Sequence, residues 1–91
     1  MNWADPVEFL PVLKRLAIKS KLSQISGLMG TAEAAALFAA DGNTTKEIGL
    51  ELGVIRPIIS TRLGTLARKG FILRVNGGWL LTEKGKAIVY G

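Results

Sequence analysis

The sequence predicts a mainly α fold with one small β-hairpin, in the α+β class. Apolar residues recur at helical spacing over most of the chain, in segments bounded by capping residues. Near the C-terminal end, Asn76-Gly77 separates two short runs of strand-forming residues, which is the strongest short signal for a hairpin. The length of 91 residues corresponds to a single domain.

The composition argues against several classes of function. The chain has no Cys and no His, so it lacks thiolate zinc ligands, disulfides and the commonest general base. Its seven carboxylates fall mostly at helix starts and show neither paired nor metal-binding spacing. We therefore expect no catalytic site, no metal and no cofactor.

The charge balance favours a polyanionic partner. Lys and Arg number 12 against 7 Asp and Glu, which gives a net charge of +5. Such a partner is nucleic acid or an acidic membrane surface, but Glu8 and Pro11 argue against a membrane-surface helix near the N-terminus. The chain also lacks a signal-peptide pattern and an apolar run of about 18 residues. We expect a cytoplasmic, nucleoid-associated protein with no membrane partner.

Residues 1–30 are expected to form a helical extension. A helix start is predicted at Asp5, with Pro6 in its first turn. Pro11 should kink or restart this helix, because proline cannot donate the required backbone hydrogen bond. Residues 20–30 are rich in Ser and Gly and should either continue a helix or pack as an ordered connector.

Two capped helices follow the extension. Thr31 is expected to cap an Ala-rich helix that runs to Ala40, and residues 41–43 (Asp-Gly-Asn) should stop it. Thr44 begins the next helix, and Glu47 lies three residues later, so the two form a capping box.

A further helix is predicted from about Arg56 to Lys69. Gly53 ends the helix before it, and Gly70 ends this one. Its buried face is set by three apolar residues at i, i+4 and i+7: Ile59, Leu63 and Leu66.

A hairpin and a short helix complete the chain. A strand is predicted over residues 71–75 and its return over residues 78–81, with Asn76-Gly77 as the turn between them. Thr82 should cap a final helix that extends to about Tyr90.

This order of elements describes a winged helix-turn-helix with an extra N-terminal helix. The chain also resembles the MarR-like prokaryotic transcription regulators over roughly residues 31–90. The resemblance rests on Thr44-Thr45-Lys46-Glu47-Ile48-Gly49, Leu52-Gly53-Val54, Ser60, Leu63, Leu66, Lys69-Gly70-Phe71-Ile72 and Leu81-Thr82-Glu83-Lys84-Gly85. We therefore expect a winged-helix domain over residues 31–91 and a separate extension over residues 1–30.

The resemblance implies a regulator that binds double-stranded DNA. The helix over about residues 56–69 would enter the major groove, and the wing over residues 71–82 would lie near the backbone. The charges support this independently, because no acidic residue lies between Glu51 and Glu83. That stretch holds Arg56, Arg62, Arg68, Lys69 and Arg74. The alternative is a solvated basic face with no partner.

At about 100° per residue, part of this helix points away from its buried face. The outward positions are Pro57, Ile58, Thr61, Thr65 and Arg68, with Ser60 and Arg62 on the flanks. The resemblance implies that Arg56 or Arg62 reads guanine, that Ser60 and Thr61 bond bases or phosphates, and that Ile58 contacts a thymine methyl. Alternatively, the Arg62 stem packs over the core with a solvated head, and Ile58 is buried against the N-terminal region.

Four further residues complete the expected interface and its support. Lys46, in the first turn of the preceding helix, would approach a phosphate, or would simply be an exposed lysine. Arg74 is the best phosphate candidate of the wing, and Asn76 at its tip is included among the DNA contacts. Trp79 is expected to pack in the core beside Phe71, with a partner-facing role as the alternative.

Three features depart from the family pattern. Ile55 stands where a capping Ser or Thr is usual, and Gly49 replaces the usual Ala, which would permit closer helix packing. The two-residue wing tip carries no Arg or Lys, so deep minor-groove insertion is in doubt.

The N-terminal helix raises the question of a second copy. Flanking helices of such regulators often dimerise, and the residues that would serve are Val7, Leu10, Ala17 and Ile18, with Trp3 and Phe9 nearby. The alternative is that this helix packs on its own domain. Its basic cluster of Lys14, Arg15, Lys19 and Lys21 would either extend phosphate contact or solubilise the helix.

A second function is compatible with the same fold. The chain could be a protein-interaction adaptor in a transcription or replication assembly. The uncharged wing tip, the outward Ile58 and the hydrophobic fraction of 48% motivate this alternative.

Overall fold

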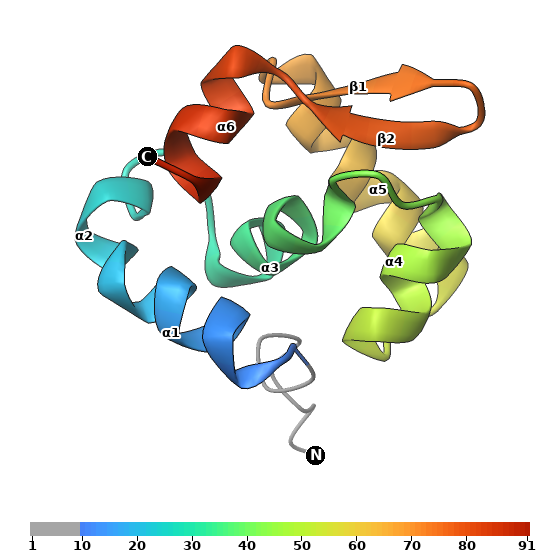
Figure 1. Ribbon diagram of the computed structural model, residues 1–91. Coiled ribbons are helices and arrows are strands. Elements are labelled where there is room, and N and C mark those ends of the chain that lie inside the picture. The colour runs from blue at the N-terminus through green and yellow to red at the C-terminus, as the bar shows by residue number, and fades with distance from the viewer. Residues whose placement is uncertain (1–9) are drawn as a thin grey trace.

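Helix α3 lies at the centre of the molecule, with the other elements arranged around it (Figure 1). The computed structural model describes residues 10–91. In chain order its elements are α1 (Val12–Ser20), α2 (Leu22–Ile25), α3 (Thr31–Ala40), α4 (Thr45–Leu52), α5 (Arg56–Arg68), β1 (Ile72–Val75), β2 (Gly78–Leu81) and α6 (Glu83–Val89). This confirms the mainly α class with one hairpin. The helix start expected at Asp5 lies outside the described residues.

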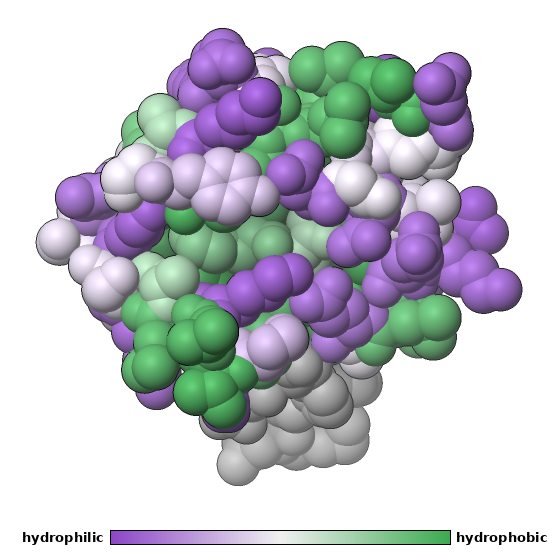
Figure 2. Space-filling model, viewed as in Figure 1, coloured by the Kyte–Doolittle hydropathy of each residue, from purple (hydrophilic) through white to green (hydrophobic). Residues whose placement is uncertain are grey.

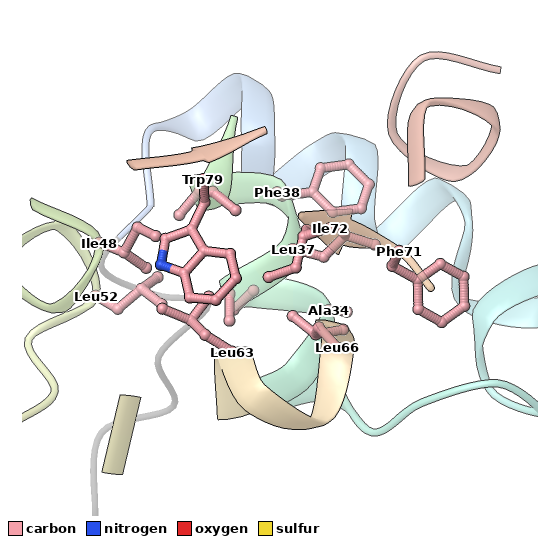
Figure 3. Packing of buried hydrophobic residues seen from close by; sticks show 14 of the residues in the cluster. Ala34, Leu37, Phe38, Ile48, Leu52, Leu63, Leu66, Phe71, Ile72 and Trp79 are labelled. Atoms are coloured by element: carbon pink, nitrogen blue, oxygen red, sulfur yellow. The ribbon is translucent and has the colours of Figure 1, made fainter. Parts of the chain in front are cut away.

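The alanine content of α3 explains its central position. All residues from Ala34 to Ala40 are buried, and α1, α4, α5, α6 and β2 pack against this helix. Small side chains let neighbouring backbones approach closely, while Leu37 and Phe38 fill the remaining space. Figure 3 shows Leu37 and Leu66 of α5 near Ala34 in this core.

The start of α3 differs from the expectation. Thr31 is already helical, and Gly30 holds the capping position with an extended backbone (φ −76°, ψ 169°) and no side-chain cap bond. The prediction that Thr31 caps the helix is therefore wrong by one residue, because its hydroxyl is not at the position that reaches the free N–H groups.

The capping box of α4 is confirmed. The Glu47 backbone N–H donates to Thr44 Oγ1 at 3.2 Å, and the Thr44 backbone N–H donates to Glu47 Oε1 at 2.9 Å. Both bonds satisfy donors that a helix start otherwise leaves unpaired. They fix the N-terminus of α4 next to the candidate binding surface.

We expect Thr44→Ala to lower the free energy of unfolding by about 1 kcal/mol. Thr31→Ala is the matched control, because Thr31 makes no cap bond. Urea denaturation of both variants measures the difference. Equal stability of Thr44→Ala and wild type would contradict the assigned cap.

The same box makes stability depend on pH. The backbone and hydroxyl hydrogen bonds from Thr44 lower the pKa of Glu47 below its ordinary value. A lowered folded pKa gives stability that is present above the unfolded pKa and lost as the pH falls through the folded pKa. Glu47→Gln should therefore remove this part of the acid-side loss in a pH series of the same unfolding measurements.

The hairpin forms with the predicted two-residue turn. β1 and β2 are antiparallel, with Leu73 opposite Leu80 and Arg74 opposite Trp79. Asn76 (φ 49°) and Gly77 (φ 80°) both have positive φ, as a tight hairpin turn requires. β1 begins at Ile72, one residue later than predicted, since the Phe71 N–H closes the end of α5 by donating to the Leu66 carbonyl at 3.0 Å.

The loop before α4 holds the outer edge of β2. The Gly42 N–H donates to the Trp79 carbonyl at 2.8 Å, and the Trp79 N–H donates to the Asn43 carbonyl at 2.9 Å. These two backbone hydrogen bonds attach the hairpin to the loop that follows α3.

Trp79 is a core residue, as expected, but its neighbours differ from the prediction. It is 8% exposed, and its Nε1–H donates to Thr45 Oγ1 of α4 at 3.0 Å. Figure 3 shows it on the side of Ile48 and Leu52, whereas Phe71 lies at the opposite end of the core. The strand alternation predicted burial correctly, but the packing partner depends on how the hairpin is docked.

Helix α6 is fixed at both of its ends. Thr82 Oγ1 accepts from the Gly85 N–H at 3.1 Å, which confirms Thr82 as its cap. At the other end, the Tyr90 hydroxyl donates to Asp41 Oδ2 at 2.8 Å, and this bond raises the pKa of Tyr90. Asp41 Oδ1 also accepts from the Leu81 N–H at 3.3 Å, so one carboxylate joins α3, β2 and the end of α6.

The N-terminal helices pack on the domain itself. α1 begins directly after Pro11, so the proline starts this helix. Leu10 and Ile18 are buried in the core that includes α3 and α5, and α2 with its following turn adds Ile25 and Met29. The residues predicted to form a dimer stripe, Leu10 and Ile18, therefore face inward, while Val7, Trp3 and Phe9 lie outside the described residues.

Candidate nucleic-acid interface

The turn between α4 and α5 is unusually tight. Gly53 adopts a left-handed conformation (φ 66°) at the end of α4, and the Val54 N–H donates back to the Gly49 carbonyl at 2.9 Å. A Cβ on Gly49 would lie 2.9 Å from the Val54 carbonyl oxygen. Gly49 thus allows the close packing expected from its place in the sequence, because an added Cβ would also lie 3.5 Å from Ile59 of α5.

The two faces of α5 match the angular prediction. Ile59, Leu63 and Leu66 are fully buried. Five of the predicted outward or flanking residues are exposed, whereas Arg62 and Thr65 are half-buried; the exposed ones are Pro57, Ile58, Ser60, Thr61 and Arg68. Ile58 is 45% exposed, so the alternative of burial against the N-terminal region is wrong.

The first turn of α5 contains both a proline and an arginine. Ile55 holds the capping position without a side-chain bond, and Pro57 lies in the first turn, where its missing N–H costs little. Arg56 is exposed at the helix start, beside the first turn of α4. A solvent-facing cation at this point is free to meet a phosphate or a base edge.

Arg62 is half-buried. Its Nε is buried and finds no hydrogen-bond partner within the part of the chain that the structure describes. The arrangement agrees with the alternative in which the Arg62 stem packs over the core. Of the two arginines proposed to read guanine, Arg56 is therefore the more accessible.

A series of hydrogen bonds runs along the outer face of α5. Thr61 Oγ1 donates to the Pro57 carbonyl and Thr65 Oγ1 donates to the Thr61 carbonyl, both at 3.1 Å. Arg68 Nη2 donates to Thr65 Oγ1 at 3.2 Å. These bonds fix the threonine side chains and direct Arg68 back along its own helix.

Most of the cations between Glu51 and Glu83 form no ion pair within the described residues and are free to contact a partner. Lys69 is the exception, since its ammonium contacts Glu33 Oε2 at 3.0 Å and the Leu28 carbonyl at 3.1 Å. Within residues 10–91, no carboxylate pairs with any of the four arginines of this stretch: Arg56, Arg62, Arg68 and Arg74. The ion pairs found there leave the positive charge of α5 and the wing uncompensated locally.

Arg74 extends this surface onto the hairpin. It is exposed, and its guanidinium lies 5.2 Å from the centroid of the Trp79 ring. A cation over an indole face is held in a defined position. Asn76 is exposed at the turn, and the tip carries no cation, as the sequence indicated.

Lys46 is exposed in the first turn of α4 and borders an open groove. The groove has a volume of about 370 Å³ and lies between the starts of α4 and α5. Its lining residues are Thr45, Lys46, Gly49, Leu50, Gly53, Val54, Ile55 and Arg56. The turn therefore brings Lys46 and Arg56 to one hollow, which places two of the predicted site residues together.

Sequence reasoning missed the apolar part of this surface. Leu50 is 74% exposed and Ile55 is 66% exposed, and both line the groove. The four-residue spacing between Lys46 and Leu50 is the signal that would have placed them on one face of α4. Figure 2 shows two other apolar patches, one over the hairpin and one over α1. Their exposed residues are Leu73, Val75 and Leu80, and Val12, Leu13 and Leu16.

The basic cluster of α1 is largely engaged within the molecule. Lys14 forms an ion pair with Glu51 of α4 at 3.1 Å. The Lys21 ammonium donates to three carbonyl oxygens at the end of α6, those of Ile88 (2.7 Å), Val89 (3.1 Å) and Gly91 (3.0 Å). Lys19 remains exposed. The cluster consequently offers less charge to a partner than its sequence suggests.

Residues 10–91 contain no group of three or more acidic, His or Cys side chains that could hold a metal ion. No helix among them is long and apolar enough to cross a membrane.

The comparisons with known proteins support the fold. No family model matches the chain, and no curated protein matches it. A solved structure of a transcriptional repressor, CouR, bound to p-coumaroyl-CoA, aligns with a TM-score of 0.61. The alignment covers 99% of this chain and 73% of the repressor chain, at 23% sequence identity. The chain thus has the winged helix-turn-helix fold of that repressor.

Proposed function

We propose that this protein is a DNA-binding transcription regulator that places α5 in the major groove and the hairpin beside the phosphate backbone. One observation carries the proposal. The stretch between Glu51 and Glu83 has no acidic residue, and its four arginines form no ion pair with a carboxylate within residues 10–91. Cations left unpaired on the exposed side of a helix and on a wing are suited to phosphates.

On this proposal, each part of the surface has a separate role. Arg56 stands at the helix start that would enter the groove, and Ser60 and Thr61 follow it on the exposed side. Lys46 and Arg74 flank α5 from α4 and β1, where they would contact phosphates on either side of the groove. Arg68 would contact the backbone from the end of α5, and Asn76 from the wing tip.

A salt-series titration tests the proposal. With about four to six phosphate contacts per protomer, the slope of log K against log salt should be about −4 to −5. Arg56→Ala should weaken binding by about 1–3 kcal/mol and reduce the slope by about 1 if the contact is to phosphate. Fluorescence anisotropy with a labelled duplex measures both quantities.

Lys19→Ala is the matched control, because Lys19 is an exposed cation on α1, away from the proposed surface. It should leave affinity within about twofold of wild type, apart from the general effect of one charge. A wild-type dissociation constant weaker than about 1 μM at low salt, or one that does not change with salt, would sink the proposal.

A homodimer remains part of this proposal, through a face of α1 different from the one first predicted. Val12, Leu13 and Leu16 are exposed on α1 (57%, 81% and 56%) and form the patch seen over α1 in Figure 2. Two protomers joined there would read half-sites about 34–36 Å apart. The stoichiometry at saturation in the same titration gives the number of protomers per duplex.

The adaptor function is kept as the second candidate because of the exposed apolar residues beside Arg56. Leu50, Ile55 and Ile58 are typical of a surface that another protein covers. On this proposal, a partner protein would bind at the groove between α4 and α5, and α5 would not enter the major groove of DNA. An Arg56→Ala variant indistinguishable from Lys19→Ala in the titration would favour the adaptor.

A further inference from the structure

The exposed face of the first two turns of α5 carries little charge. Between residues 56 and 61, Arg56 is the sole charged side chain. Behind it lie Pro57, Ile58 and Thr61, all exposed, with Ile58 at 45%. Exposed apolar area has a free-energy cost in water, and phosphate binding does not require it. An exposed isoleucine at the centre of this face therefore indicates a contact other than phosphate.

The hydroxyl protons of the two threonines on this face are already engaged. Thr61 Oγ1 donates its proton to the Pro57 carbonyl, and Thr65 Oγ1 donates to the Thr61 carbonyl while accepting from Arg68. A hydroxyl has one proton to donate, so neither threonine has a donor left for a base edge. Thr61 still offers a partner its methyl group and the lone pairs of its hydroxyl oxygen, which can accept a hydrogen bond but cannot donate one.

We infer that Ile58 and Thr61 recognise thymine methyl groups in the major groove, an inference that rests on the proposed function of α5. Thymine presents a C5-methyl there, whereas the other bases present hydrogen-bonding groups. The Ile58 side chain offers no acceptor to a cytosine amino group placed against it, so burying that group there carries a desolvation cost. The two side chains therefore act as specificity-determining residues for A·T pairs next to the base contacted by Arg56.

Replacing thymine with deoxyuridine tests this inference, because it removes only the methyl. The duplex that wild-type protein selects most strongly from a randomised library is resynthesised with deoxyuridine at every thymine. We expect affinity to fall about fourfold per contacted methyl, or about fifteenfold for two. The salt slope should stay the same, since the phosphates are unchanged.

Two variants connect the effect to the named side chains. Ile58→Ala/Thr61→Ser removes the facing methyl groups and retains the hydroxyl that bonds the Pro57 carbonyl. It should bind the thymine and deoxyuridine duplexes with equal affinity. Leu73→Ala is the control: it removes a 44% exposed apolar side chain from the hairpin and should keep the full preference for thymine. Circular dichroism confirms that each variant folds.

The outcomes separate this inference from the function on which it rests. Equal wild-type affinity for the two duplexes, with a normal salt slope, overturns the methyl recognition and leaves DNA binding in place. A double variant that still prefers thymine about fifteenfold overturns the assignment to Ile58 and Thr61. Absence of binding to any duplex at low salt contradicts the proposed function itself.

Discussion

Trp79→Ala is expected to lower the free energy of unfolding by about 3–5 kcal/mol, the range for removing a buried tryptophan. Trp79 is 8% exposed and lies between the hairpin and α4, where its Nε1–H donates to Thr45 Oγ1 at 3.0 Å. The deletion leaves a cavity on this side of the core and an unpaired Thr45 hydroxyl. For a domain of this size, such a loss is a large fraction of total stability.

The variant should also disorganise the wing. Arg74 loses the ring beneath its guanidinium, which lies 5.2 Å away in the wild type. DNA affinity should therefore fall even under conditions where the variant remains folded. Urea denaturation followed by circular dichroism measures the stability, and the anisotropy titration measures the affinity.

Trp79→Phe is the control for volume. It keeps most of the aromatic packing and loses the hydrogen bond to Thr45, so we expect a smaller loss of about 1–3 kcal/mol. If Trp79→Ala and Trp79→Phe destabilised the protein equally, the assigned packing role would be wrong.

Gly85→Ala is expected to cost about 3 kcal/mol or more, at the upper end of what overpacking does. Gly85 is buried in the first turn of α6, and a Cβ there would overlap the carbonyl oxygen of Phe71. That oxygen cannot move freely, because it accepts from the Thr82 N–H at 3.0 Å. Thr82 Oγ1 in turn donates to the Gly70 carbonyl at 2.6 Å. Helix α6 would have to separate from the start of β1.

Gly64→Ala is the matched control for a glycine in a helix. Its nearest neighbour to an added Cβ is the Arg68 side chain at 3.9 Å, an ordinary contact. Alanine should be more stable there by up to about 1 kcal/mol, because it has the higher helix propensity. Thermal and urea unfolding of both variants measure the contrast, and a Gly85→Ala protein as stable as wild type would falsify the assigned contact.

Local signals in the sequence predicted the elements well, because their physical cause is local. The Thr44–Glu47 box, Gly53 and the Asn76-Gly77 turn each set the backbone over a few residues. The burial of Ile59 and its partners also follows from spacing along one helix. These features need no knowledge of what packs against them.

The features that the sequence did not predict are mostly contacts between segments far apart in the chain. Lys14 contacts Glu51, which is 37 positions away in the sequence. Lys21 contacts the end of α6, more than 60 positions away. No local sequence pattern predicts either contact. The same holds for Trp79, which alternation placed in the core but not beside Thr45. The boundary error at Thr31 is of another kind: Gly30 takes the capping position with an extended backbone, which a threonine-based rule does not anticipate.

The candidate surface was predicted in part for the same reason. Its positive charge could be predicted, because the absence of acidic residues between Glu51 and Glu83 is visible in the sequence alone. The accessibility of individual side chains is not: Arg62 is partly covered, and Leu50 is open to solvent at 74%. The exposure of each side chain depends on how the elements pack in three dimensions, which the sequence pattern does not give.

The Lys21 ammonium links the N-terminal helices to the C-terminal end of α6. By binding the carbonyls of Ile88, Val89 and Gly91, it neutralises the negative end of α6 and joins two segments almost 70 positions apart. Closing so long a loop makes the opening of either segment depend on the other. We therefore expect the N-terminal helices and the final helix to open as one cooperative unit, so that their amide protons exchange with solvent at similar rates.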